Sequence, residues 1–231
     1  MVLYLGDSLT CGTVGQSYLK FMAPHAHKNK GLNGDTTFGA LRRLRAYRRR
    51  SWYRDVETCV VEIGTNDILQ PYMFRDSLVW SICYKSRSWR KRWAETPAAF
   101  DALYREIVET LIQDGKRVIL VGLSVMELED YPWERLRAEN EQMRRIGEDY
   151  DAEFVDLLAT EERERPAYRR DYKWGKTGFV RALDILTMVL LPFTKDKLSQ
   201  ARGLSLTVDG VHFNTFAARL LAERLEVLFD R

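Results

Sequence analysis

The residue types that ester cleavage requires stand in two short segments near the ends of the chain. Ser8 follows Gly6 and Asp7, and Asp209 precedes His212 by three residues. A covalent route to ester cleavage needs a nucleophile, a base that removes its proton, and a group that orients the base. Ser8, His212 and Asp209 could fill these roles in that order. Of the three histidines, only His212 has a carboxylate three residues before it.

The same reaction needs fixed donors for the negative charge that develops on the substrate oxygen. We expect the backbone N–H groups of Ser8 and Gly34 and the side-chain amide of Asn66 to form such an oxyanion hole. Glycine lets the backbone approach a substrate closely, and an asparagine amide donates without ever ionising.

Each of these residues also has a purely structural interpretation. Ser8 could cap a helix, Asp209 could shape a turn, Gly34 could serve backbone geometry, and His212 could be an ordinary loop residue. Taken together, their complementary roles favour the catalytic interpretation, because the roles and mutual geometry of several residues decide a site.

The elements that must position these residues can be read from the hydrophobic pattern. Short apolar runs that end in glycine or a polar turn are typical of strands buried on both faces of a parallel sheet. The predicted strands are Val2–Leu5, a weaker one at Lys28–Leu32, Thr58–Ile63, Arg117–Val121 and Glu153–Leu157. The predicted helices are Thr37–Arg50, Pro97–Gln113, Pro132–Tyr150 and one from Thr215 to the C-terminus. Strands that alternate with helices predict an α/β fold of three layers, doubly wound.

In such a fold, ligands bind where the strands end at their carboxyl side. Four segments follow predicted strands or precede the last helix, and they hold all the candidate residues. They are Gly6–Thr10, Asn33–Thr36, Gly64–Asp67 and Asp209–His212. We therefore expect them to meet at one edge of the sheet.

These segments also resemble a known family. Gly6-Asp7-Ser8-Leu9 with Gly12, then Gly34, Gly64-x-Asn66-Asp67 and Asp209-x-x-His212 are similar to the four sequence blocks of the SGNH hydrolases, also called the GDSL lipase/esterase family. The resemblance spans almost the whole chain and implies a flavodoxin-like α/β/α fold with a central parallel sheet of about five strands. It implies no metal and no organic cofactor. It assigns Ser8 as nucleophile, Asp209 and His212 as its partners, and Ser8, Gly34 and Asn66 as oxyanion donors, with Asp7 and Asp67 bracing the loops.

Substrate contacts are predicted from apolar residues near these blocks. Family members commonly have proline after the catalytic histidine, whereas this chain has Phe213, which could add an apolar wall. Residues 70–93 are rich in aromatic side chains, Tyr72 and Phe74 among them. This range, taken as an irregular loop, suits either an acyl or alcohol pocket or core packing.

Residues 160–208 fit the alternation of strands and helices least well. We interpret them as an insertion within a single domain of residues 1–231. The apolar stretch Leu183–Phe193 lies inside it and could be a lid over the pocket, a subunit contact, or a helix packed on the core. As a lid or pocket wall, Leu186 and Leu190 would set the acyl-chain preference.

Composition narrows the function classes. A net charge of +3 does not indicate a nucleic-acid binder, and we interpret the basic segment Leu41–Arg50 as a solvated helix face with its leucines turned to the core. Three cysteines without scaffold spacing, and a start without a signal pattern, predict a cytoplasmic protein. No apolar run is long enough to span a bilayer. His25 and His27 lack further ligands at metal-site spacing.

The sequence thus predicts a serine esterase that acts on a small-molecule, lipid or sugar ester, with no nucleic-acid partner and no stable membrane insertion. Acyl transfer to an alcohol is the first alternative, because it uses the same residues. A non-catalytic protein that binds anions or nucleic acid through the arginine-rich segment is the second. Each of these functions is compatible with a homo-oligomer.

Overall fold

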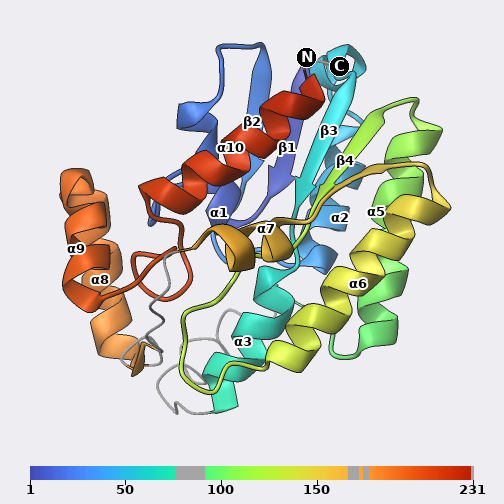
Figure 1. The fold of residues 1–231 in the computed structure, drawn as a ribbon. Coiled ribbons are helices and arrows are strands. Elements are labelled where there is room, and N and C mark those ends of the chain that lie inside the picture. Colours follow the sequence, from blue (N-terminus) through green and yellow to red (C-terminus); the bar gives the residue numbers. More distant parts are fainter. Residues whose placement is uncertain (76–91, 166–171, 174–176, 230–231) are drawn as a thin grey trace.

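Five parallel strands form the centre of the molecule in the computed structural model, which describes residues 1–75, 92–165, 172–173 and 177–229. The strands are β1 (Val2–Gly6), β2 (His27–Gly31), β3 (Thr58–Glu62), β4 (Arg117–Val121) and β5 (Glu153–Val155). Their order in the sheet is β2-β1-β3-β4-β5 (Figure 1). The chain reverses its direction of travel across the sheet after β2, so a switch point lies beside β1.

Burial explains which strands take the centre. Every residue of β3 is buried, and β4 is buried from its second residue onward. By contrast β2 has the sequence HKNKG and stays partly exposed, as suits an edge strand. The prediction of a weak strand at this place is confirmed.

Helices cover both faces of the sheet. On one face α2 (Thr37–Tyr47), α5 (Pro97–Gln113) and α6 (Trp133–Asp149) pack in a row, while α10 (Thr215–Phe229) crosses the other face beside α7 (Leu157–Glu164) (Figure 1). The predicted three-layer α/β/α fold with five parallel strands is confirmed.

The remaining elements are short or peripheral. The one-turn helix α1 (Ser8–Cys11) follows β1, and α3 (Thr65–Arg75) follows β3. Towards the C-terminus come α8 (Gly178–Leu190) and α9 (Lys195–Arg202). The 3₁₀ turns are η1 (Tyr18–Phe21), η2 (Ser51–Asp55) and η4 (Pro192–Thr194).

Several sequence-based boundaries were wrong, and the helix predicted over Thr37–Arg50 ends at Tyr47. Residues from Thr65 form helix α3 and not a loop, so Asn66, Tyr72 and Phe74 are helical. The strand predicted to reach Leu157 ends at Val155, because the Asp156 side chain accepts a hydrogen bond from the Ala159 N–H and starts α7. The rest of the predicted aromatic range, residues 76–91, lies outside the described residues.

The basic segment packs as predicted. In α2, Leu41 and Leu44 are buried in the main core. Arg45 forms an ion pair with Glu106 on α5, and Arg48 with Asp114. These two arginines lie on the outer, solvated side of the helix, whereas Arg43 is largely buried, pairs with Asp35 and donates to the Gly6 carbonyl.

The apolar stretch within residues 160–208 forms helix α8. Unlike an ordinary amphipathic helix, α8 turns charged side chains towards the protein and leucines towards solvent. Its inward face carries Arg181, Asp184 and Met188, all buried. Leu186 and Leu190 are 54% and 66% exposed. They line no part of the cavity described below, so the expectation that these two leucines form a pocket wall was wrong.

Candidate active site

Ser8 stands at the start of α1, directly beyond the end of β1. The carboxylate of Asp7 accepts a hydrogen bond from the Leu9 N–H at 2.9 Å and so caps this single turn. The tight passage from strand to helix presents the Ser8 side chain at the edge of a cavity, where the residue is 7% exposed.

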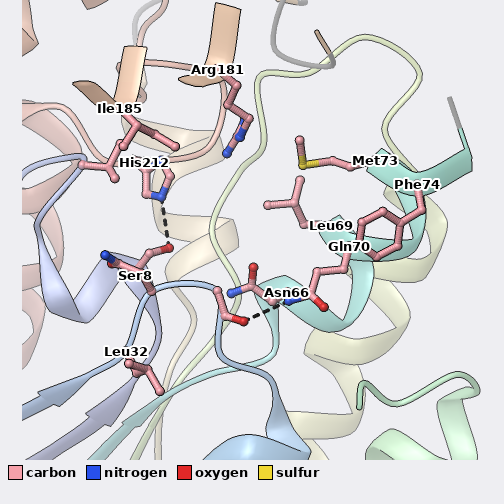
Figure 2. A pocket seen from close by; sticks show the side chains of 13 residues that line it. Ser8, Leu32, Asn66, Leu69, Gln70, Met73, Phe74, Arg181, Ile185 and His212 are labelled. Carbon is pink, nitrogen blue, oxygen red and sulfur yellow. Dashed lines mark hydrogen bonds between the residues drawn. The ribbon is translucent and has the colours of Figure 1, made fainter. Parts of the chain in front are cut away.

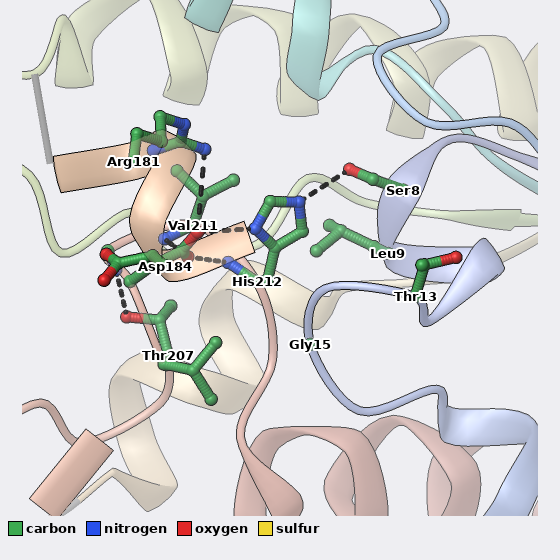
Figure 3. A network of polar contacts seen from close by, with 12 residues as sticks. Ser8, Leu9, Thr13, Gly15, Arg181, Asp184, Thr207, Val211 and His212 are labelled. Carbon is green, nitrogen blue, oxygen red and sulfur yellow. Dashed lines mark hydrogen bonds and ion pairs between the residues drawn. The ribbon is translucent and has the colours of Figure 1, made fainter. Parts of the chain in front are cut away.

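His212 and Asp209 share the turn that precedes α10. The Nε2 atom of His212 lies 3.0 Å from the Oγ atom of Ser8, and its Nδ1 lies 2.8 Å from Oδ2 of Asp209 (Figure 3). The other carboxylate oxygen, Oδ1, accepts hydrogen bonds from the N–H groups of Val211 and His212. Gly210 has φ +88°, a conformation that disfavours residues with a Cβ, so the turn depends on it. The three residues predicted as a triad are therefore brought into one hydrogen-bonded chain.

Neighbouring groups lower the pKa of the Asp209 carboxyl group. Burial by itself raises the pKa of this carboxyl, but the charges of His212 and Arg181 and the hydrogen bonds from His212 bring the pKa well below its usual range. The Nη2 atom of Arg181 lies 3.8 Å from Oδ2 of Asp209. Asp209 is thus kept as an anion that can orient the imidazole.

Gly34 and Asn66 face the same cavity as Ser8. The amide nitrogen of Asn66 donates a hydrogen bond to Oδ2 of Asp7 at 3.0 Å, which ties α3 to the Ser8 turn. Gly34 has φ +67°, and its carbonyl accepts a hydrogen bond from Gln70. The side-chain amide nitrogen of Asn66 carries two hydrogens, so it can donate to Asp7 and to a substrate oxygen together.

The two remaining aspartates of the sequence blocks are buried braces. Asp7 links Leu9 and Asn66, while Asp67 accepts hydrogen bonds from Thr37 and from the Ala94 N–H. Burial raises the pKa of Asp7 to about 7 and that of Asp67 to about 6. Both aspartates contact backbone and side chains of the site loops and do not line the cavity.

The cavity itself has a volume of about 530 Å³ and opens beside Ser8 (Figure 2). Ser8, Gly34, Asn66 and His212 are among its polar lining residues. Leu69, Met73 and Phe74 from α3 form an apolar side across from Ser8 and His212, while Leu32 lies beside Ser8 and Ile185 beside His212 (Figure 2).

Of the predicted substrate residues, only Phe74 lines this cavity. The Tyr72 hydroxyl donates to the backbone carbonyl of Glu129, and Tyr72 is buried in the core. Phe213 is fully buried in the core, so it forms no wall of the cavity.

Sequence reasoning missed Arg181 and Ile185, which come to the cavity from α8, and Leu69, which comes from α3; Met73 lies in the range 70–93 that was considered for the pocket. A signal for Arg181 was present. Arg181 and Asp184 are the only charged residues in the apolar run of α8, and their spacing places them on one face. Among the described residues, no group of His, Cys, Asp or Glu could hold a metal ion.

The family model of the GDSL-like lipase/acylhydrolase family matches residues 4–220. None of the curated proteins matches the chain in sequence. No helix in the described part of the chain combines the length and apolar character that crossing a bilayer requires.

Solved structures share the fold at low identity. LAE5, an alpha/beta hydrolase from the metagenome of Lake Arreo, has a TM-score of 0.62 at 15% identity, covering 98% of this chain and 93% of that one. A GDSL-like lipase from Bacteroides thetaiotaomicron has 0.61 at 14%, covering 99% and 87%. Axe2, an acetylxylan esterase from Geobacillus stearothermophilus, has 0.56 at 18%, covering 97% and 91%.

The five-stranded parallel sheet between two layers of helices defines an α/β/α protein of the fold that these solved structures share. The chain belongs to the GDSL-like lipase/acylhydrolase family. It is accordingly a hydrolase that acts on ester bonds.

Proposed function

We propose that the chain is a serine esterase that cleaves carboxylic esters through an acyl-enzyme, with Ser8 as nucleophile. The observation that carries this proposal is the continuous chain Ser8 Oγ–His212 Nε2 and His212 Nδ1–Asp209 Oδ2, at 3.0 and 2.8 Å. These two contacts place the Ser8 hydroxyl against the base that would take its proton, and the imidazole of His212 against the carboxylate that would orient it.

The reaction proceeds in two halves. Ser8 Oγ attacks the carbonyl carbon while His212 Nε2 takes the Ser8 proton, and Asp209 stabilises the imidazolium that forms. His212 then gives this proton to the leaving alcohol as the carbon–oxygen ester bond breaks. In the second half His212 takes a proton from water, the hydroxide attacks the acyl carbon, and the proton returns to Ser8 as the acid departs.

The oxyanion of each tetrahedral intermediate requires donors that point at the former carbonyl oxygen of the substrate. We propose the N–H groups of Ser8 and Gly34 and the amide of Asn66 for this role. Support comes from their shared position along the cavity and from the Asp7 carboxylate, which orients the Asn66 amide. The apolar side of the cavity, with Leu69, suits the acyl or alcohol portion of the ester.

Steady-state kinetics with 4-nitrophenyl esters of increasing chain length, alongside acetylated sugars, test the proposal. We expect Ser8→Ala and His212→Ala each to abolish turnover while circular dichroism and the thermal midpoint stay close to those of the wild type. Removing one triad member costs roughly as much as removing the set. Unchanged kinetics in Ser8→Ala would refute the assignment.

Acyl transfer shares these residues, because an alcohol can take the place of water in the second half. Product analysis in the presence of glycerol or a sugar acceptor separates the two reactions. A new ester that forms at the expense of free acid indicates transfer, and free acid alone indicates hydrolysis.

A further inference from the structure

The outward face of α8 is an apolar surface at the periphery of the molecule, where α8 lies together with α9 (Figure 1). Five large apolar side chains of α8 are 47–79% exposed, and they are Phe179, Leu183, Leu186, Val189 and Leu190. Leu191 and Phe193 extend the same exposed surface beyond the end of the helix. Between residues 177 and 194, no charged side chain is exposed. A continuous apolar surface of this kind marks a site of interaction.

The size of this face matches one side of a protein–protein interface. A fully exposed side chain of this kind has about 150–200 Å² of surface, so the seven exposed fractions correspond to roughly 700 Å². A standard interface buries about 800 Å² on each partner, whereas the largest apolar patch of an ordinary monomer is about 300–600 Å². The face is therefore large enough to form the centre of a stable dimer.

The order of the side chains along α8 suits a second copy of the same helix. One stripe consists of Phe179, Leu183, Leu186 and Leu190, with spacings of four, three and four residues that are the same from either end. A two-fold interface requires a surface that complements itself. When two such helices pack antiparallel, Leu183 of one copy meets Leu186 of the other. The same symmetry brings Phe179 to Leu190 of the second copy.

A lipid surface fits this helix less well. A helix that lies in a membrane interface ordinarily carries Lys and Arg along its polar face, next to the lipid headgroups. The charged residues of α8 are Arg181 and Asp184, and both are buried against the protein. Arg181 lies near Asp209, and Asp184 pairs with Arg202. The helix α8 therefore offers no basic flank to lipid headgroups.

We propose that the outer face of α8 is the interface of a homodimer in which two copies of α8 pack antiparallel about a two-fold axis. The dimer also bears on the active site, because the inward side of α8 brings Ile185 to the cavity and Arg181 to Asp209. On that side, Met188 belongs to a small apolar cluster that is separate from the main core. The second copy then holds α8 in place from outside.

Size-exclusion chromatography with light scattering measures the oligomeric state. At about 50 µM, which exceeds the micromolar upper end of dissociation constants for interfaces of standard size, we expect the wild type to have about twice the 27.0 kDa mass of one chain. Leu186→Lys places a charge at the centre of the interface and should give a monomer. Its circular dichroism should match that of the wild type, because Leu186 is half exposed in a single copy. Leu183→Lys is the second variant and should behave in the same way.

Val227→Lys is the matched control. Val227 lies on α10 and is 53% exposed, against 54% for Leu186. The same charge at this position should leave the dimer intact. Monomers in both Leu186→Lys and Val227→Lys would show that an added surface lysine dissociates the dimer wherever it stands, and would overturn the assignment to α8.

A mixing experiment tests the antiparallel arrangement. Leu183→Lys and Leu186→Glu should each be monomeric alone, because each homodimer would bury two unpaired charges. In an equimolar mixture, the new lysine of one chain faces the new glutamate of the other, while the remaining pair of leucines is unchanged. The mixture should therefore elute as a dimer. A mixture that stays monomeric overturns the antiparallel arrangement.

Kinetics test the link to the active site. The Leu186→Lys monomer should turn over 4-nitrophenyl acetate with a kcat/KM about tenfold below that of the wild-type dimer, since small displacements near catalytic groups are costly. Val227→Lys should match the wild type. Equal kcat/KM in monomer and dimer would overturn the role of the second copy in holding α8. The oligomeric state is measured without substrate, so it is independent of the esterase proposal.

A wild type that is monomeric at about 50 µM overturns the dimer, since interfaces of this size reach micromolar affinity or better. That monomer is then sedimented with vesicles of phosphatidylcholine and phosphatidylglycerol. Cosedimentation that is lost in Leu186→Lys would assign the outer face of α8 to a lipid surface instead.

Discussion

The carboxylate of Glu127 provides a way to disturb the Asp209–His212 turn without touching a reacting group. Glu127 is buried and accepts five hydrogen bonds from the three residues that lead into this turn. Oε1 accepts from the N–H and the hydroxyl of Ser205, at 2.7 and 2.6 Å. Oε2 accepts from the N–H groups of Leu206 and Thr207 and from the Thr207 hydroxyl, at 3.1, 2.9 and 2.6 Å.

Replacing Glu127 with Gln is expected to destabilise the protein although the shape is almost unchanged. The less costly amide orientation puts the NH₂ group in place of Oε1, where it faces the Ser205 N–H, donor against donor. The hydroxyl of Ser205 can rotate to accept, but the backbone N–H cannot, so it stays buried without an acceptor. That costs roughly 1–3 kcal/mol, and the remaining bonds lose the charge that strengthens them. We expect a total of about 3 kcal/mol and a fall of about 6–12 °C in the thermal midpoint.

Activity should fall with stability, because the loosened segment carries Asp209 and His212. A displacement of about 1 Å in a catalytic group can cost about a hundredfold. Thermal unfolding followed by circular dichroism and the kcat for a short 4-nitrophenyl ester measure the two effects. Glu129→Gln, the same change at a half-buried residue paired with Lys173, is the control and should alter neither. A fall of less than 2 °C in Glu127→Gln, together with unchanged kcat, would refute this account of the turn.

Three further substitutions test other parts of the site. Asn66→Ala should lower kcat roughly 10²–10³-fold with little change in KM, the usual loss of one oxyanion donor; a rise in KM alone would make Asn66 a binding residue instead. Burial raises the pKa of Asp7 to about 7, so the folded protein holds a proton between about pH 4 and 7 that the unfolded chain releases. The urea-derived stability of the wild type should therefore fall relative to Asp7→Asn as the pH rises through that window, and a difference that does not vary with pH contradicts this. Lys195→Met should lower the thermal midpoint by several degrees, because Lys195 Nζ donates to the carbonyls of residues 12, 13 and 15, and an unchanged midpoint would show that these bonds add nothing.

Most of the fold was predictable, because its elements carry their signals locally. Helix α5 and strand β4 have the bounds that the pattern predicts, since Pro97 and Thr96 mark a helix start and a buried run ends at Gly122. Helix α3 was not predictable in the same way. It contains Pro71, and its first residues include the polar Asn66 and Asp67, which read locally as a turn. Tertiary contacts to Asp7 and Thr37 stabilise that first turn.

The sequence by itself determined the alternation of strands and helices, and with it the expectation that Ser8, Gly34, Asn66 and the Asp209–His212 pair meet at one edge of the sheet. This was possible because each of these residues follows or precedes an element with a strong local pattern, and parallel strands end at a common edge.

Only the tertiary structure decided which side chains surround these residues. The position of Arg181 at the cavity, the exposure of Leu186 and the burial of Phe213 all depend on how α8 and the turn before α10 pack against the rest of the molecule. A hydrophobic pattern ordinarily turns the apolar face of a helix to the core, but α8 turns Arg181 and Asp184 inward because Asp209 and Arg202 are there to pair with them. Such pairing joins residues that are far apart in the sequence or belong to different elements, so no local rule can anticipate it.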